Sequence, residues 1–168
     1  VSLISGVHDL LPNRVGGAAL QKNLETLGDI QYTQEEIDFA LELQRNNGKP
    51  EIGIDGKIRP LRETLSSPGG GSTDSGDVSY NVPVVSLAAT TAPKGVPWHS
   101  WSVVASSGMS IGHKGMLHAA KALGMTMVDI FKDGKLRENI KKEFDEKIGE
   151  YEYDPYLDPG PPPIDYVD

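Results

Sequence analysis

The stretch Val82-Pro83-Val84-Val85-Ser86-Leu87-Ala88-Ala89 decides the predicted fold, because it is apolar almost without interruption. A strand that is covered on both faces has this pattern, whereas a strand with one solvated face alternates. Pro83 is tolerated because it lies near the start of the run. With amphipathic helices on both sides of it in the sequence, the run predicts an α/β fold in which helices flank a sheet.

Four helices are predicted from apolar residues at helical spacing and from terminal signals. They cover Gly16 to Leu27, the residues after Thr33 up to Asn47-Gly48, Ser110 to Lys132, and the apolar stripe from Leu136 to Ile148. The second begins with a capping box, in which the side chains of Thr33 and Glu36 each bond the backbone N–H of the other residue. These four segments supply the helical layers of the predicted fold.

The segment Ser110 to Lys132 gives the strongest helical signal. Its predicted inward face consists of Ile111, Leu117, Ala120, Leu123, Met127 and Ile130. Gly112, Gly115 and Gly124 lower the helix propensity of the same segment. We therefore expect another part of the protein to pack closely against this helix, or a ligand to bind near its start.

The two ends of the chain have different patterns. Residues 1–7 alternate in the manner of a strand that is cut in its middle, and the chain opens on Val1 rather than Met. We therefore expect the C-terminal part of a longer protein. Residues 151–168 contain five prolines and four tyrosines, which excludes a helix and predicts an extended or mobile tail.

Composition limits the classes of function. The chain has 168 residues, a net charge of −8 and no cysteine. The acidic balance argues against nucleic acid and against an anionic membrane surface as partners. No apolar run approaches the roughly twenty residues of a membrane span. The absence of cysteine is compatible with a cytoplasmic protein, and it excludes disulfides and thiolate sites.

Two histidines are candidates for chemistry. His99 lies between two tryptophans in Pro97-Trp98-His99-Ser100-Trp101, directly after the predicted strand, where an α/β sheet places its ligands. It is the best candidate for a metal ligand, with the indoles as a dry wall, and the alternative is an imidazole packed between them. His113 lies in the first turn of the long helix and is a candidate for binding a substrate carboxylate. His118 is interpreted as structural, and His8 as a surface residue or a contact to a missing domain.

A glycine-rich loop precedes the predicted strand and reads Gly69-Gly70-Gly71-Ser72-Thr73-Asp74-Ser75-Gly76-Asp77. Asp74 and Asp77 are candidates for orienting a substrate or a metal-bound histidine. The alternative is that both aspartates bond their own backbone in a turn. The loop is not a phosphate-binding P-loop, because no Gly-Lys-Ser/Thr follows the glycines.

Several stretches together resemble the C-terminal half of the zinc-dependent amidohydrolases and peptidases that include carboxypeptidase G, aminoacylase and the hippurate hydrolases. Within that family, the chain is most similar to the aminobenzoyl-glutamate utilisation branch. The matching stretches are Leu11-Pro12-Asn13-Arg14, Tyr32-Thr33-Gln34-Glu35-Glu36, Gly71-Ser72-Thr73-Asp74-Ser75-Gly76-Asp77-Val78-Ser79, Pro97-Trp98-His99-Ser100-Trp101 and Ser110-Ile111-Gly112-His113-Lys114-Gly115-Met116. The third and fifth are distinctive for that branch.

The resemblance implies a mixed sheet flanked by helices, as the second half of a zinc-peptidase-like catalytic domain. Residues 1–10 would be the exit strand of a dimerisation lid, residues 11–150 the catalytic half-domain, and residues 151–168 an acidic tail. It also implies one or two zinc ions, a glutamate base in the part that precedes this chain, and a homodimer formed through the lid.

The resemblance implies roles for individual residues. His99 matches the last metal ligand of the family, and His113 is the second choice because its Gly-His-Lys-Gly context is similar to that of some relatives. The expected substrate is a small amide or dipeptide. The residues expected to line its pocket are Asn13, Ser72, Thr73, Asp74, Asp77 and His113.

Two other functions remain open from the sequence. The incomplete ligand set and the acidic, proline-rich tail are compatible with a non-catalytic binding or regulatory module related to the family. The apolar stripe of Leu136 to Ile148 is compatible with a scaffold protein that packs on a partner, although covering its own sheet is the simpler role. A complete set of metal ligands in the protein that contains these residues would favour the enzyme.

Overall fold

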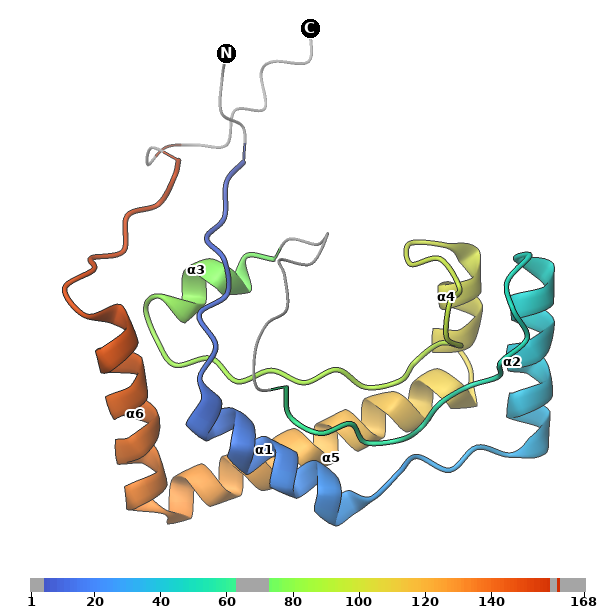
Figure 1. Ribbon diagram of the computed structural model, residues 1–168, viewed down its shortest axis with the longest axis horizontal. Helices are drawn as coiled ribbons and strands as arrows, with labels where there is room; N and C mark the ends of the chain where they lie inside the picture. Colours follow the sequence, from blue (N-terminus) through green and yellow to red (C-terminus); the bar gives the residue numbers. More distant parts are fainter. Residues whose placement is uncertain (1–4, 63–72, 158–159, 161–168) are drawn as a thin grey trace, which may run out of the picture. The chain divides into compact units, whose positions relative to one another are not determined.

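In the part of the chain that the computed structural model describes, six helices form the regular structure (Figure 1). The structure describes residues 5–62, 73–157 and 160. The helices are α1 (Arg14–Leu27), α2 (Gln34–Asn46), α3 (Ser75–Ser79), α4 (Trp101–Ser107), α5 (Ser110–Lys132) and α6 (Gly134–Ile148). Contacts divide the chain into two units, whose bounds include residues outside the described part. The first contains Val1–Gly17, Arg62–Val85 and Gly134–Asp168, and the second contains Ala18–Leu61 and Ser86–Asp133.

The predicted α/β fold is wrong, because the described residues form helices and no sheet. The run from 82 to 89 is extended, but its one pairing is an isolated parallel bridge between Pro12 and Val84. A strand needs neighbouring strands for its N–H and C=O groups, and an apolar composition does not supply them. Pro83 also removes a donor. The mixed sheet of a zinc-peptidase-like half-domain and the lid exit strand are therefore both absent from residues 5–13 and 73–89, and residues 1–4 lie outside the described part.

The capping signals of the sequence are confirmed in detail. The Thr33 hydroxyl accepts a hydrogen bond from the Glu36 N–H at 3.3 Å, and the Thr33 N–H donates to the Glu36 carboxylate at 2.7 Å. Gly28 directly follows α1 with φ of 74°, and Gly48 closes α2 with φ of 61°. Both values are in the left-handed region that favours glycine at a helix end. All four predicted helices are present, and α5 has the predicted bounds.

The start of α1 is fixed by side chains from within the first unit. Asn13 accepts a hydrogen bond from the Gly16 N–H at 2.8 Å and donates to the Ile140 carbonyl of α6 at 2.9 Å. Glu143 of α6 accepts from the N–H groups of Arg14 and Val15. These three N–H groups have no acceptor inside α1, so the side chains of Asn13 and Glu143 supply the missing acceptors. The negative charge of Glu143 also complements the positive end of the helix.

The predicted inward face of α5 is only partly correct. Ile111 is buried, but three large members of the predicted face, Leu117, Leu123 and Met127, are exposed in the structure. The other buried residues of α5 are small: Gly112, Gly115, Ala122 and Thr126. Small residues let the backbone of a neighbouring segment approach closely, which apolar periodicity alone does not reveal.

The glycines of α5 show where this close approach occurs. A Cβ atom at Gly115 would overlap the carbonyl oxygen of Thr90, and one at Gly112 would overlap the Ser107 backbone. A Cβ atom at Gly124 would meet nothing within 4 Å. The expectation that something packs closely against this helix is therefore confirmed for two of the three glycines.

We predict opposite effects of alanine at two of these positions. Gly115→Ala should lower the free energy of unfolding by about 1–3 kcal/mol, because the methyl group has to displace backbone atoms. Gly124→Ala is the matched control and should raise it by up to about 1 kcal/mol through helix propensity. Urea denaturation followed by circular dichroism measures both. Equal midpoints for the two variants would contradict the packing of Thr90 on α5.

Candidate functional site

His99 lies in the second unit, in the loop before α4, and its side chain is exposed. Its φ of 59° is the one positive value among the described non-glycine residues. The left-handed conformation costs an L-residue roughly 1–2 kcal/mol, although histidine visits it more often than most. Trp98 and Trp101 are 70% and 59% exposed, so the indoles do not form the predicted dry wall. The imidazole of His99 is therefore solvent-exposed, as are the indoles on both sides of it in the sequence.

The described residues do not assemble a metal centre. They contain no group of three or more His, Cys, Asp or Glu side chains that could hold a metal ion. A structural zinc site has four protein ligands, and a catalytic zinc site has three protein ligands and a water molecule. His99 is a single donor, and His113 is a second exposed imidazole in the first turn of α5. The assignment of either histidine as a ligand stays a prediction.

A carboxylate of the chain itself lies at the start of α5. Glu36 is 3% exposed and accepts a hydrogen bond from Lys114 Nζ at 2.6 Å. Lys114 also donates to the Gln31 carbonyl at 2.9 Å. Burial opposes the charge of Glu36, but hydrogen bonds from Lys114, Ser110 and the Thr33 N–H outweigh it and lower its pKa to about 2. The Glu36 carboxylate is thus an anion of the protein itself that lies near the start of α5. Binding of a substrate carboxylate by His113 stays a prediction.

The Glu36–Lys114 pair predicts a pH dependence of stability. Because the pKa of Glu36 is lower in the folded protein than its ordinary value of 4.5, its contribution is complete above about pH 5. That contribution should be lost as the pH falls from 4.5 towards 2. Glu36→Gln should cost about 2–3 kcal/mol at pH 7 and less at pH 3, because it leaves Lys114 without its partner. Urea denaturation at both pH values measures the difference, and an equal cost at both would contradict the assignment.

The loop before α3 uses its hydroxyls within itself. The Thr73 hydroxyl accepts from the Ser75 N–H at 3.2 Å and donates to the Ser75 hydroxyl at 3.2 Å. Asp74 is exposed and its side chain forms no cap bond to α3. Ser72 lies outside the described residues. The role of Ser72, Thr73 and Asp74 in substrate binding stays a prediction, as does that of Asn13, whose amide is engaged at the start of α1.

Asp77 of α3 is held by a histidine whose position the sequence did not predict. His8, expected at the surface or against a missing domain, is only 7% exposed. Its Nδ1 lies 2.8 Å from Asp77 Oδ1, and its Nε2 lies 2.8 Å from the Tyr151 hydroxyl. Its backbone N–H is 3.4 Å from the same Asp77 oxygen. The bond from the His8 ring is the main reason why the pKa of Asp77 is lowered, against the opposing effect of burial.

Four tyrosines surround the His8 ring. Tyr156 stacks on it with a centroid distance of 4.3 Å and an interplanar angle of 8°. Tyr80, Tyr151 and Tyr153 lie at 5.1, 6.2 and 5.2 Å. The Tyr153 hydroxyl donates to Asp77 Oδ1 at 3.1 Å. Three tyrosines of the described tail therefore lie against the His8 ring, and we call residues 151–156 the tyrosine strap.

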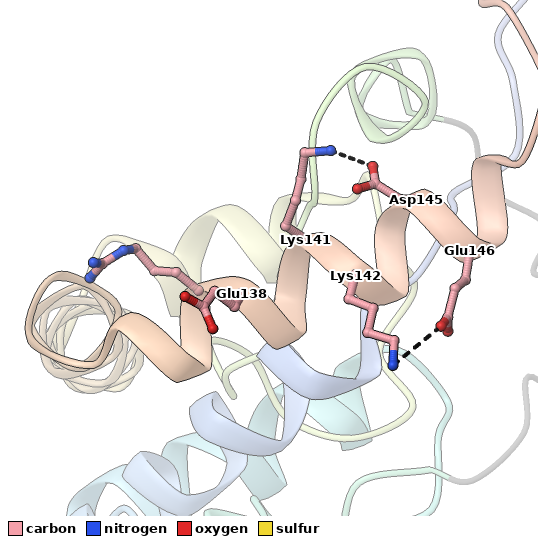
Figure 2. A pocket seen from close by; sticks show the side chains of 6 residues that line it. Glu138, Lys141, Lys142, Asp145 and Glu146 are labelled. Carbon is pink, nitrogen blue, oxygen red and sulfur yellow. Dashed lines mark hydrogen bonds and ion pairs between the residues drawn. The ribbon is translucent and has the colours of Figure 1, made fainter.

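A shallow hollow on α6 carries no comparable arrangement (Figure 2). It is lined by six side chains of that one helix: Arg137, Glu138, Lys141, Lys142, Asp145 and Glu146. Lys141 pairs with Asp145, and Lys142 pairs with Glu146 at 3.7 Å, both along the helix. Such exposed pairs are typical of a solvated helix face and contribute little to stability.

Comparison with known proteins reveals a sequence relationship that the structure alone does not show. The chain is 33% identical over 157 residues to one subunit of the p-aminobenzoyl-glutamate hydrolase of Escherichia coli (strain K12). The chain is a distant homologue of this hydrolase subunit. The match includes 79% of the chain and 33% of the relative, so the chain spans about a third of that protein's length. No family model and no solved structure matches the chain.

This relation confirms the resemblance that the sequence motifs indicated. It does not assign a role to any single residue. None of the described helices has the length and apolar character needed to cross a membrane.

Proposed function

We propose that the chain is part of an amidohydrolase that cleaves the amide bond of p-aminobenzoyl-glutamate or of a similar N-acyl amino acid. The observation that carries the proposal is the 33% identity to a subunit of p-aminobenzoyl-glutamate hydrolase. The distinctive glycine-rich loop and the Gly-His-Lys-Gly segment support it. The substrate is then a small anionic amide, and two thirds of the relative lie outside the match.

The proposal gives roles to individual residues. His99, exposed in its loop, would serve as one ligand of a zinc ion, and His113 is the second choice. When bound, zinc would polarise the amide carbonyl and acidify a water molecule. The described residues contain no group of three or more potential ligands, so the remaining ligands would come from other parts of the enzyme. Among the residues that resemble the family's substrate loop, Ser72, Thr73, Asp74 and Asp77 would contact the substrate.

Two histidine variants test the assignment in the gene product that contains these residues. His99→Ala should reduce bound zinc by about one equivalent or weaken its retention during dialysis, and should lower the rate of p-aminobenzoyl-glutamate hydrolysis at least about 100-fold, because a zinc site tolerates the loss of a ligand poorly. His113→Ala is the matched control, since His113 is also an exposed imidazole of the second unit. It should keep the zinc content and change the Michaelis constant alone. Inductively coupled plasma mass spectrometry and release of p-aminobenzoate are the measurements.

The outcomes separate the alternatives. Loss of zinc in His113→Ala but not in His99→Ala would exchange the two assignments. A gene product that binds p-aminobenzoyl-glutamate without hydrolysing it, with or without zinc, would contradict the enzyme and favour a binding module. A gene product that neither binds nor hydrolyses the compound would contradict the proposed substrate.

A further inference from the structure

The surroundings of Asp77 differ between its two carboxylate oxygens. Oδ1 accepts three hydrogen bonds, from His8 Nδ1, the His8 N–H and the Tyr153 hydroxyl. Within residues 5–62 and 73–157, Oδ2 accepts none. The side chain of Asp77 is 22% exposed, whereas that of His8 is 5% exposed. Among the donors of the described residues, Oδ1 is thus saturated and Oδ2 is not used.

We propose that Asp77 is a pre-oriented hydrogen-bond acceptor for an N–H group of the ligand, and that His8 and Tyr151 are its positioning residues. The ligand part rests on the proposed function, because the amide and the amino group of p-aminobenzoyl-glutamate are the donors considered. The positioning part rests on the geometry of the first unit alone. Both residues act through Asp77 and do not contact the ligand themselves.

The hydrogen-bond pattern fixes the tautomer of His8. An ionised carboxylate can only accept, so the short contact to Asp77 places the proton of a neutral imidazole on Nδ1. Nε2 is then the acceptor, and it receives the hydroxyl proton of Tyr151 at 2.8 Å. Tyr151, His8 and Asp77 form a directed chain in which each group orients the next, as outer hydrogen-bond partners orient the ligands of a metal site.

The backbone around these three hydrogen-bonded groups is closely packed, which restricts its movement. A Cβ atom at Gly76 would overlap the carbonyl oxygen of His8, so α3 and residue 8 touch through their backbones. The Leu11 N–H donates to the Ser79 hydroxyl at 2.8 Å, and that hydroxyl donates to the Gly76 carbonyl at 2.6 Å. Tyr156 closes the outer face of the His8 ring by stacking. A site held in this way loses little entropy when a ligand binds.

The first test reads the tautomer of His8 and needs no activity. In the ¹⁵N-histidine-labelled gene product at about pH 8, where imidazoles are ordinarily neutral, long-range ¹H–¹⁵N spectra should show His8 protonated at Nδ1. Tyr151→Phe should move the Nε2 resonance by removing its donor, and Asp77→Asn should abolish the single tautomer. Tyr80→Phe is the matched control, because its hydroxyl donates to Asp9 instead. Protonation at Nε2, or an unchanged spectrum in Asp77→Asn, would overturn the positioning role.

The second test reads ligand binding in the gene product, with p-aminobenzoyl-glutamate as the probe in isothermal titration calorimetry. Asp77→Asn should weaken binding about tenfold or more, the usual loss for a hydrogen bond to a charged group. Tyr151→Phe should weaken it by a smaller factor, because Tyr151 acts on Asp77 only through His8. Tyr80→Phe should keep the affinity of the parent. Unchanged affinity in Asp77→Asn would overturn the acceptor role and leave the proposed function intact. No binding to the parent protein would contradict the proposed function and the acceptor role together, whereas the tautomer decides the positioning role by itself.

Discussion

The structure depends on buried polar side chains that satisfy the backbone of segments with no regular partner. In a sheet, backbone N–H and C=O groups pair along the strands, but the described residues have no sheet in which to do so. Gln44 shows most clearly how a side chain takes the place of a strand partner. Its amide donates to the Gly53 and Lys94 carbonyls and accepts from the N–H groups of Ile52 and Gly53, while its side chain is fully buried. One side chain thereby holds two loops against α2.

The same device recurs in both units and explains the composition of the interior. Asn13 and Ser79 bond backbone groups in the first unit. In the second unit, the Thr126 hydroxyl donates to the Ala122 carbonyl and accepts from the Asn23 side chain. Fully buried polar side chains are as prominent as apolar ones, among them Gln44, Ser79, Ser102 and Ser106. A buried polar group is costly when unpaired and specific when paired. The fold is therefore specified by donor and acceptor geometry as much as by apolar packing.

Features of the structure that depend on residues close together in the sequence can be predicted from the sequence. The capping box of Thr33 and Glu36, the glycines at the helix ends and the stripe around Ile140 act within a few residues, so the four long helices can be predicted from the sequence. The apolar run after Val82 cannot be resolved in this way, because a strand exists only if other segments pair with it. Burial on α5 is mispredicted for a related reason, since the close approach of Thr90 depends on a segment that is distant in the sequence.

The candidate site shows the same division. Residue type and family resemblance single out His99 and the Asp77 loop. The contact between His8 and Asp77 spans 69 positions, and no spacing rule reveals it. The cluster of tyrosines in the tail is visible as composition, but composition alone indicates only an extended segment. Its role as a packed strap requires the position of the His8 ring.

The exposed apolar side chains of α5 have a consequence for handling the protein. Met116, Leu117 and Met127 are all more than half exposed, and they share this helix with Leu123 and Val128. Exposed apolar side chains on one helix favour adsorption and reversible clustering as the concentration rises. Environment-sensitive dyes such as anilinonaphthalene sulfonate should therefore fluoresce with the native protein, and thermal melts that use them should start from a high baseline. Methionine oxidation would make the same surface more polar and the preparation more soluble.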